Sequence, residues 1–115
     1  MRAEFQEQAF PDRFGESLVT LERERGIRCH FGSWLIGGEP GVILVDVGDF
    51  STSANAIKAE LWEWYGIDSL HAGFDFDEPV LFSYAVGVVL EKMADELRDE
   101  RAVAHFHEWL TGAGL

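Results

Sequence analysis

The sequence contains a single cysteine, Cys29, among its 115 residues. One cysteine forms no disulfide within the chain and supplies no cysteine cage for zinc. Its surroundings, "GIRCHF", are apolar and strand-like. We therefore expect Cys29 to be a small buried core residue rather than a nucleophile.

Long apolar runs are also lacking, because no stretch reaches the ~20 apolar residues that a membrane helix needs. The opening "MRAEFQEQAFPDRFGE" is polar and has no apolar segment of a signal peptide. We therefore expect a cytoplasmic protein with no membrane partner.

Basic residues are scarce, with 9 Lys and Arg against 21 Asp and Glu, for a formal net charge of −12. Nucleic-acid binding requires basic patches that displace counterions, so this balance counts against a nucleic-acid partner. It favours solubility and repels anionic surfaces.

The apolar residues form a pattern of alternating helices and strands. The expected elements are helix 16–25, strands 27–36 and 42–47, helices 54–66 and 80–100, and strand 102–106, with loops at 1–13 and 68–79. Gly26 and Gly66 would end the first two helices, and Ser53 and Asp77 would cap the next two. The glycine-rich turn "GGEPG" is typical of a hairpin connection. The order of elements predicts an α/β layered domain with a largely parallel sheet, in which 42–47 is buried on both faces.

The closing stretch "AVAHFHEWLTGAGL" carries the most reactive side chains of the chain. His107, Glu108 and Trp109 follow the last expected strand, and in such sheets ligands bind beyond the carboxyl ends of the strands. A carboxylate accepts paired sugar hydroxyls, and an aromatic face packs on a pyranose, so these residues suit a carbohydrate site. His105 is either a core histidine or a second member of this site.

Three further groups of polar and aromatic residues have more than one possible role. His105 and His107 face the same side of an extended strand and could bind zinc, although a binuclear metallohydrolase would need Asp and His where Trp109 and Leu110 stand. Asp46 is either a ligand contact or a cap for the turn that follows it. The aromatic residues of one expected helix, Trp62, Trp64 and Tyr65, suit core or interface packing better than a cofactor site.

Four stretches of the chain resemble one known family. "AVAHFHEWLTGAGL" closely resembles the H-F-H-E-W-x-x-G motif of the family-3 glycogen synthases, the eukaryotic type with archaeal and bacterial relatives. "GIRCHFGSWLIGGEPGVILVDVG", "AELWEWYGID" and "EPVLFSYAVGVVL" are similar to further family segments, in the family's order. The resemblance covers residues 26–115, whereas 1–25 read only as a loop and a helix.

This resemblance implies a partial Rossmann-like domain with an incomplete sheet, a single segment of the N-terminal, acceptor-side domain of a GT-B glycosyltransferase. The implied reaction transfers glucose, with retention, from UDP-glucose or ADP-glucose to the non-reducing end of an α-1,4-glucan. His107, Glu108 and Trp109, with His105 as a second candidate, would face glucan or donor sugar, and no metal or cofactor is expected. Ser33 and Gly37 depart from the usual Arg and Glu of the family.

The family's glycine-rich donor loop and its cation-bearing C-terminal domain have no counterpart in these residues. We therefore expect the chain alone to be inactive, since cations are needed to stabilise the leaving nucleotide diphosphate. Open sheet edges also predict self-association or a covering partner. The alternatives are a non-catalytic glucan-binding module or partner subunit, and a metal-dependent hydrolase fragment.

Overall fold

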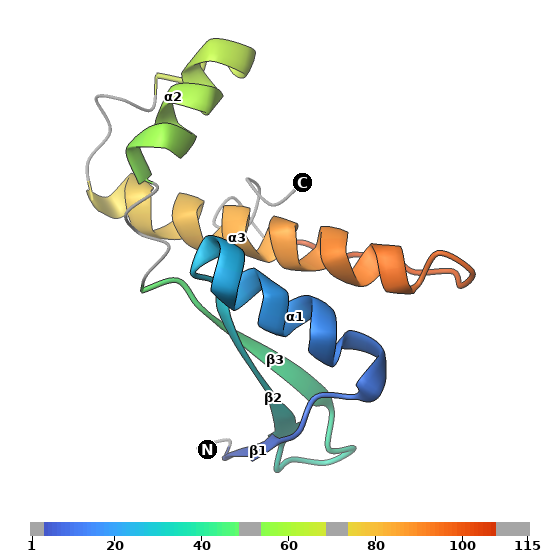
Figure 1. Ribbon diagram of the computed structural model, residues 1–115. Coiled ribbons are helices and arrows are strands. Elements are labelled where there is room, and N and C mark those ends of the chain that lie inside the picture. Colours follow the sequence, from blue (N-terminus) through green and yellow to red (C-terminus); the bar gives the residue numbers. More distant parts are fainter. Residues whose placement is uncertain (1–3, 49–53, 69–73, 108–115) are drawn as a thin grey trace.

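A computed structural model of the chain describes residues 4–48, 54–68 and 74–107 (Figure 1). This part of the chain forms a three-stranded sheet and three helices. The elements are β1 (Phe5–Gln8), α1 (Asp12–Arg25), β2 (Arg28–Trp34), β3 (Gly41–Asp46), α2 (Ala54–Tyr65) and α3 (Phe74–Glu96). Together they make a partial α/β domain with an open sheet, which confirms the expected fold class.

The sheet has the order β1-β2-β3 and both pairings are antiparallel. The expectation of a largely parallel sheet is therefore wrong for these strands. The reason is the connection: residues 35–40 join β2 to β3, and a link this short makes a hairpin, whereas parallel neighbours need a long crossover. The hairpin itself, predicted from the glycine-rich turn, is confirmed. Within it, Gly38 has φ +85° and the Glu39 N–H donates to the Ile36 carbonyl at 2.9 Å.

Strand β1 and the first turn of α1 lie where a loop was expected. Strand β1 has the sequence FQEQ, and its polar side chains are exposed. It pairs with β2 so that Phe5 lies opposite Trp34 and Gln8 opposite Phe31. Because β1 is an edge strand with little burial, its sequence lacks the apolar alternation by which strands are recognised.

The core lies between α1, α3 and one face of the sheet. In Figure 1, α1 runs beside α3, and both lie on the same side of β2 and β3. The buried apolar residues are Leu18, Leu21, Ile27, Cys29, Ile57, Leu81, Ala85 and Val89. The burial expected for Cys29 is thus confirmed, because the inward side of β2 meets these helices.

Strand β3 is covered on only one face, not on both as its apolar run predicted. Ile43 and Val45 pack against the core, whereas Leu44 between them is 38% exposed. Strands alternate their side chains between the two faces. Since both neighbouring helices lie on the same side, the alternate residues of β3 stay on an open face.

Helices α1 and α2 end as predicted, each at a glycine with positive φ. Gly26 has φ +70° and donates to the Glu22 carbonyl at 3.1 Å. Gly66 has φ +65° and donates to the Trp62 carbonyl at 2.9 Å. The predicted cap at Ser53 lies outside the described residues.

Helix α3 spans Phe74–Glu96 rather than 80–100, so Pro79 lies inside it instead of in its first turn. Because proline has no backbone N–H, α3 lacks one main-chain hydrogen bond at this position, its sixth residue. Asp77 is consequently a helical residue and not the predicted cap. Although α3 is long, it does not meet the apolar requirement for crossing a membrane, and neither does any other helix in the described ranges.

The strand expected at 102–106 is absent from the structure, where residues 101–107 have no regular conformation. Val103, at the centre of this apolar stretch, is 96% exposed. A strand forms only beside a neighbour that accepts its hydrogen bonds. None of the described strands pairs with 102–106, which explains why the apolar pattern alone does not produce a strand here.

Candidate functional site

The predicted sugar-facing segment is described only in part. His105 and His107 are both exposed, and their rings stack with centroids 4.3 Å apart and planes inclined by 23°. The two imidazoles thus lie together, as expected from their spacing. His105 is therefore no core histidine in this structure. Glu108 and Trp109 lie outside the described residues, so their placement in the site stays a prediction.

The two histidines do not form part of a larger metal-binding cluster in the described ranges. No group of three or more His, Cys, Asp or Glu side chains there is arranged to hold a metal ion. Protein zinc sites use three or four such ligands. The metallohydrolase interpretation therefore gains no support from the described part of the chain.

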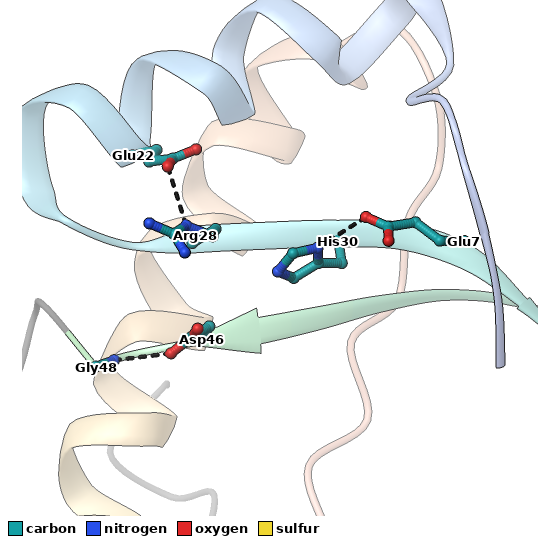
Figure 2. Close-up of polar contacts among 6 residues, drawn as sticks. All are labelled: Glu7, Glu22, Arg28, His30, Asp46 and Gly48. Carbon is teal, nitrogen blue, oxygen red and sulfur yellow. Dashed lines mark hydrogen bonds and ion pairs between the residues drawn. The ribbon is translucent and has the colours of Figure 1, made fainter.

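Exposed polar side chains from β1, β2 and α1 form two contacts along β2 (Figure 2). His30 Nδ1 lies 2.8 Å from Glu7 Oε1, and Arg28 Nε donates to Glu22 Oε1 at 3.0 Å. These contacts join β2 to β1 and to α1. All four side chains are more than a third exposed, and solvent-exposed pairs contribute only about 0–1 kcal/mol each.

Asp46 makes the turn-capping contact that was one of its two expected roles. Its Oδ1 accepts the backbone N–H of Gly48 at 2.9 Å, immediately after β3 (Figure 2). Beside it, Gly26, Arg28, Asp46 and Gly48 line a small polar hollow of about 90 Å³.

Cys29 provides no reactive thiol. Burial, and to a smaller extent the nearby Glu22 carboxylate, raise the pKa of its thiol to about 11. Because the thiolate is the nucleophilic form, a thiol with this pKa is inert near neutral pH. The chemistry of Cys29 agrees with its predicted role in the core.

Lys58 and Asp77 form an ion pair between α2 and α3 that the sequence did not reveal. Lys58 Nζ lies 2.6 Å from Asp77 Oδ1, at angles outside those of a hydrogen bond, and Lys58 is only 8% exposed. A lysine this buried requires an opposite charge nearby. The signal that could have found the pair is a lone lysine at the buried face of a predicted amphipathic helix, next to Ile57.

The aromatic residues of α2 lie on the surface of this chain and not in its core, so interface packing is the one of the two expected roles that stays a prediction. Trp62 is 52% exposed, and Trp64 and Tyr65 are each 71% exposed. The buried side of α2 is formed by Ile57 and Lys58 instead. Helix α2 meets the rest of the fold with one face only, at α3, and this leaves its remaining aromatic side chains uncovered (Figure 1).

Two of these aromatic residues line a hollow between α2 and α3, which we call the α2–α3 hollow. Its lining residues are Glu60, Leu61, Trp64, Tyr65 and Tyr84, and its volume is about 130 Å³. The Tyr84 hydroxyl donates to Glu60 Oε2 at 3.3 Å, so a polar pair lies among the rings. The sequence gives no sign of this hollow, because its lining residues come from two helices that are separated along the chain.

Comparison with known proteins assigns the chain to one family. A family described as glycogen synthase matches residues 1–115. The chain is 38% identical over 99 residues to glycogen [starch] synthase isoform 2 of Saccharomyces cerevisiae, an alignment that covers 86% of this chain and 14% of that protein. It is 37% identical over 92 residues to glycogen [starch] synthase of Caenorhabditis elegans, covering 78% of this chain and 14% of that protein. With the human liver enzyme the identity is 32% over 97 residues, covering 84% and 14% respectively.

Proposed function

Because the chain belongs to the glycogen synthase family, we propose that it forms part of a retaining glycosyltransferase. The reaction adds glucose from UDP-glucose or ADP-glucose to the non-reducing end of an α-1,4-glucan. The observation that carries this proposal is the family match over residues 1–115. The chain spans about 14% of the length of the relatives compared above, so the activity belongs to a longer polypeptide.

In this proposal the chain contributes the sugar-facing segment of the acceptor-side domain. Glu108 accepts hydrogen bonds from the hydroxyls of a glucose unit, Trp109 packs on its apolar face, and His107 and His105 supply further polar contacts. The exposure of His105 and His107 supports this assignment, because a ligand can reach both rings.

The donor phosphates are held by other parts of the longer protein. A leaving nucleotide diphosphate requires cationic groups around it, and this chain carries a net charge of −12. The chain alone is therefore expected to transfer no glucose. We also propose that the open face of the sheet is covered by a partner, either the remainder of the longer protein or a second copy of the chain. The proposed location is the cytoplasm, and the single free cysteine is compatible with it.

Two measurements on the 115-residue chain test the proposal. The first follows incorporation of labelled glucose from UDP-glucose and ADP-glucose into maltoheptaose, and we expect none above the background without protein. The second measures maltoheptaose binding, which should be weakened by Glu108→Ala and by Trp109→Ala. Turnover by the isolated chain contradicts the division of labour described above, and binding that neither substitution affects contradicts the assigned sugar site.

A further inference from the structure

The Lys58–Asp77 ion pair lies within the contact between α2 and α3, where the other bordering side chains are apolar. Helix α2 lies beside the first turns of α3 and extends away from the sheet (Figure 1). The residues that border the contact are Ala54, Ile57 and Lys58 of α2 and Asp77, Val80 and Leu81 of α3, and they leave no space for a water molecule between them. The ion pair is therefore part of a packed contact between two helices.

The apolar side chains of this contact do not by themselves determine where α2 lies along α3. On the face of α3 that carries Asp77, the residues at the next helical spacings are Val80, Leu81, Tyr84 and Ala85. None of these four side chains carries a charge. A displacement of α2 by one turn along α3, about 5.4 Å, would keep apolar contacts but would move the Lys58 ammonium from a carboxylate to uncharged groups.

The burial of Lys58 makes such a displacement costly. Lys58 is only 8% exposed, and its Nζ lies 2.6 Å from Asp77 Oδ1. Breaking a buried ion pair is strongly unfavourable, because it leaves a buried charge without its partner. Exchanging the whole pair for apolar side chains is often neutral. The pair therefore disfavours other positions of α2 more than it stabilises the fold.

We propose that the Lys58–Asp77 pair selects one position of α2 on α3, as a buried polar residue selects the register of a coiled coil. The α2–α3 hollow depends on this position, because Glu60 and Trp64 come from α2 and Tyr84 comes from α3. In the selected position the Tyr84 hydroxyl donates to Glu60 Oε2 at 3.3 Å. Lys58 and Asp77 do not line the hollow and are positioning residues for it.

The test measures the distance between spin labels on the two helices of the 115-residue chain by pulsed electron paramagnetic resonance. The labels are attached at Glu63→Cys on α2 and Glu91→Cys on α3, which are both exposed positions. The chain without these two substitutions should take up no label, because Cys29 is buried. We expect one narrow distance distribution for the labelled chain. The double variant Lys58→Met and Asp77→Leu should show added distances, shifted by up to about 5.4 Å, without a lower urea midpoint.

Two further variants complete the experiment. Asp77→Asn should show the same added distances together with a lower urea midpoint, because it keeps the buried ammonium but removes the carboxylate. Glu22→Gln is the matched control, because it removes the exposed ion pair with Arg28. Its distance distribution should equal that of the unsubstituted chain.

Every other outcome decides against the inference. An unchanged distance distribution in the double variant shows that apolar packing places α2. A double variant that loses as much stability as Asp77→Asn shows that the pair holds α2 rather than selecting its position. Added distances in Glu22→Gln as well trace the effect to the loss of any ion pair. If the double variant does not fold, Asp77→Asn decides: added distances support the inference, and an unchanged distribution overturns it.

Discussion

Substitution of Gly32 by alanine is the sharpest test of how β1 packs on the sheet. A methyl group at this position of β2 would overlap the carbonyl oxygen of Gln6 and lie 2.7 Å from two ring carbons of Phe5. The backbone of β1 cannot yield without losing its ladder to β2, and Phe5 cannot yield without leaving Trp34, whose ring it meets edge-on at 5.9 Å. Overpacking costs about 1–3 kcal/mol and loss of an aromatic contact about 0.5–1.5 kcal/mol.

We therefore expect Gly32→Ala to lower the free energy of unfolding by about 2–4 kcal/mol, measured by urea denaturation with far-ultraviolet circular dichroism. Hydrogen exchange at residues 5–8 should also accelerate. Gly41→Ala is the matched control on the same sheet, because its added methyl meets only the Phe31 ring at 3.8 Å and should change stability by less than about 0.5 kcal/mol. If Gly32→Ala is as stable as Gly41→Ala, the described packing of β1 is refuted.

Three further substitutions or conditions probe the helices and the core. Asp77→Asn should destabilise the chain by about 2 kcal/mol and Lys58→Met by less, because the first removes the carboxylate that faces a buried ammonium; equal urea midpoints would contradict this. Stability should fall as the pH rises from about 9 to about 11, because the unfolded Cys29 thiol ionises first and the folded one only near its raised pKa. Cys29→Ala should flatten this alkaline decline, and an unchanged decline would assign it to other groups. Gly66→Ala should cost about 1 kcal/mol, because φ of +65° strains an alanine, and an unchanged melting temperature would argue against this helix end.

Features that depend on neighbouring residues in the sequence were predictable from the sequence. Gly26 and Gly66 adopt positive φ as expected of helix-ending glycines, and the hairpin follows from the glycine-rich turn. Cys29 lies in the core because apolar residues surround it along β2 and above it on the helices. In each case the information lies within a few residues of the feature.

Features that depend on distant neighbours were not predictable from the same patterns. Strand β1 is polar and exists through its pairing with β2, so its own sequence carries almost no sign of it. The apolar run in β3 indicated burial on two faces, although helices cover only one. The exposure of Trp64 and Tyr65 likewise depends on where α3 meets α2, which helical periodicity does not reveal.

The candidate site also combines features that the sequence predicted with features that it did not. The rings of His105 and His107 lie together as their spacing suggested, although the strand from which this was expected does not form. The family resemblance predicted the glycogen synthase assignment, and the comparison confirms it. The α2–α3 hollow is formed by two helices that a loop separates, and no sequence motif predicted it.

The most direct test of the sugar-facing segment is an amide-resolved NMR titration of the isotopically labelled chain with maltoheptaose. The proposal predicts saturable shifts at residues 105–109 at millimolar ligand, and their loss in Trp109→Ala. The same titration with an equal concentration of a non-carbohydrate polyol controls for solvent effects. Shifts absent from 105–109 at saturating maltoheptaose would contradict the claim that this segment of the glycogen synthase family chain contacts glucan.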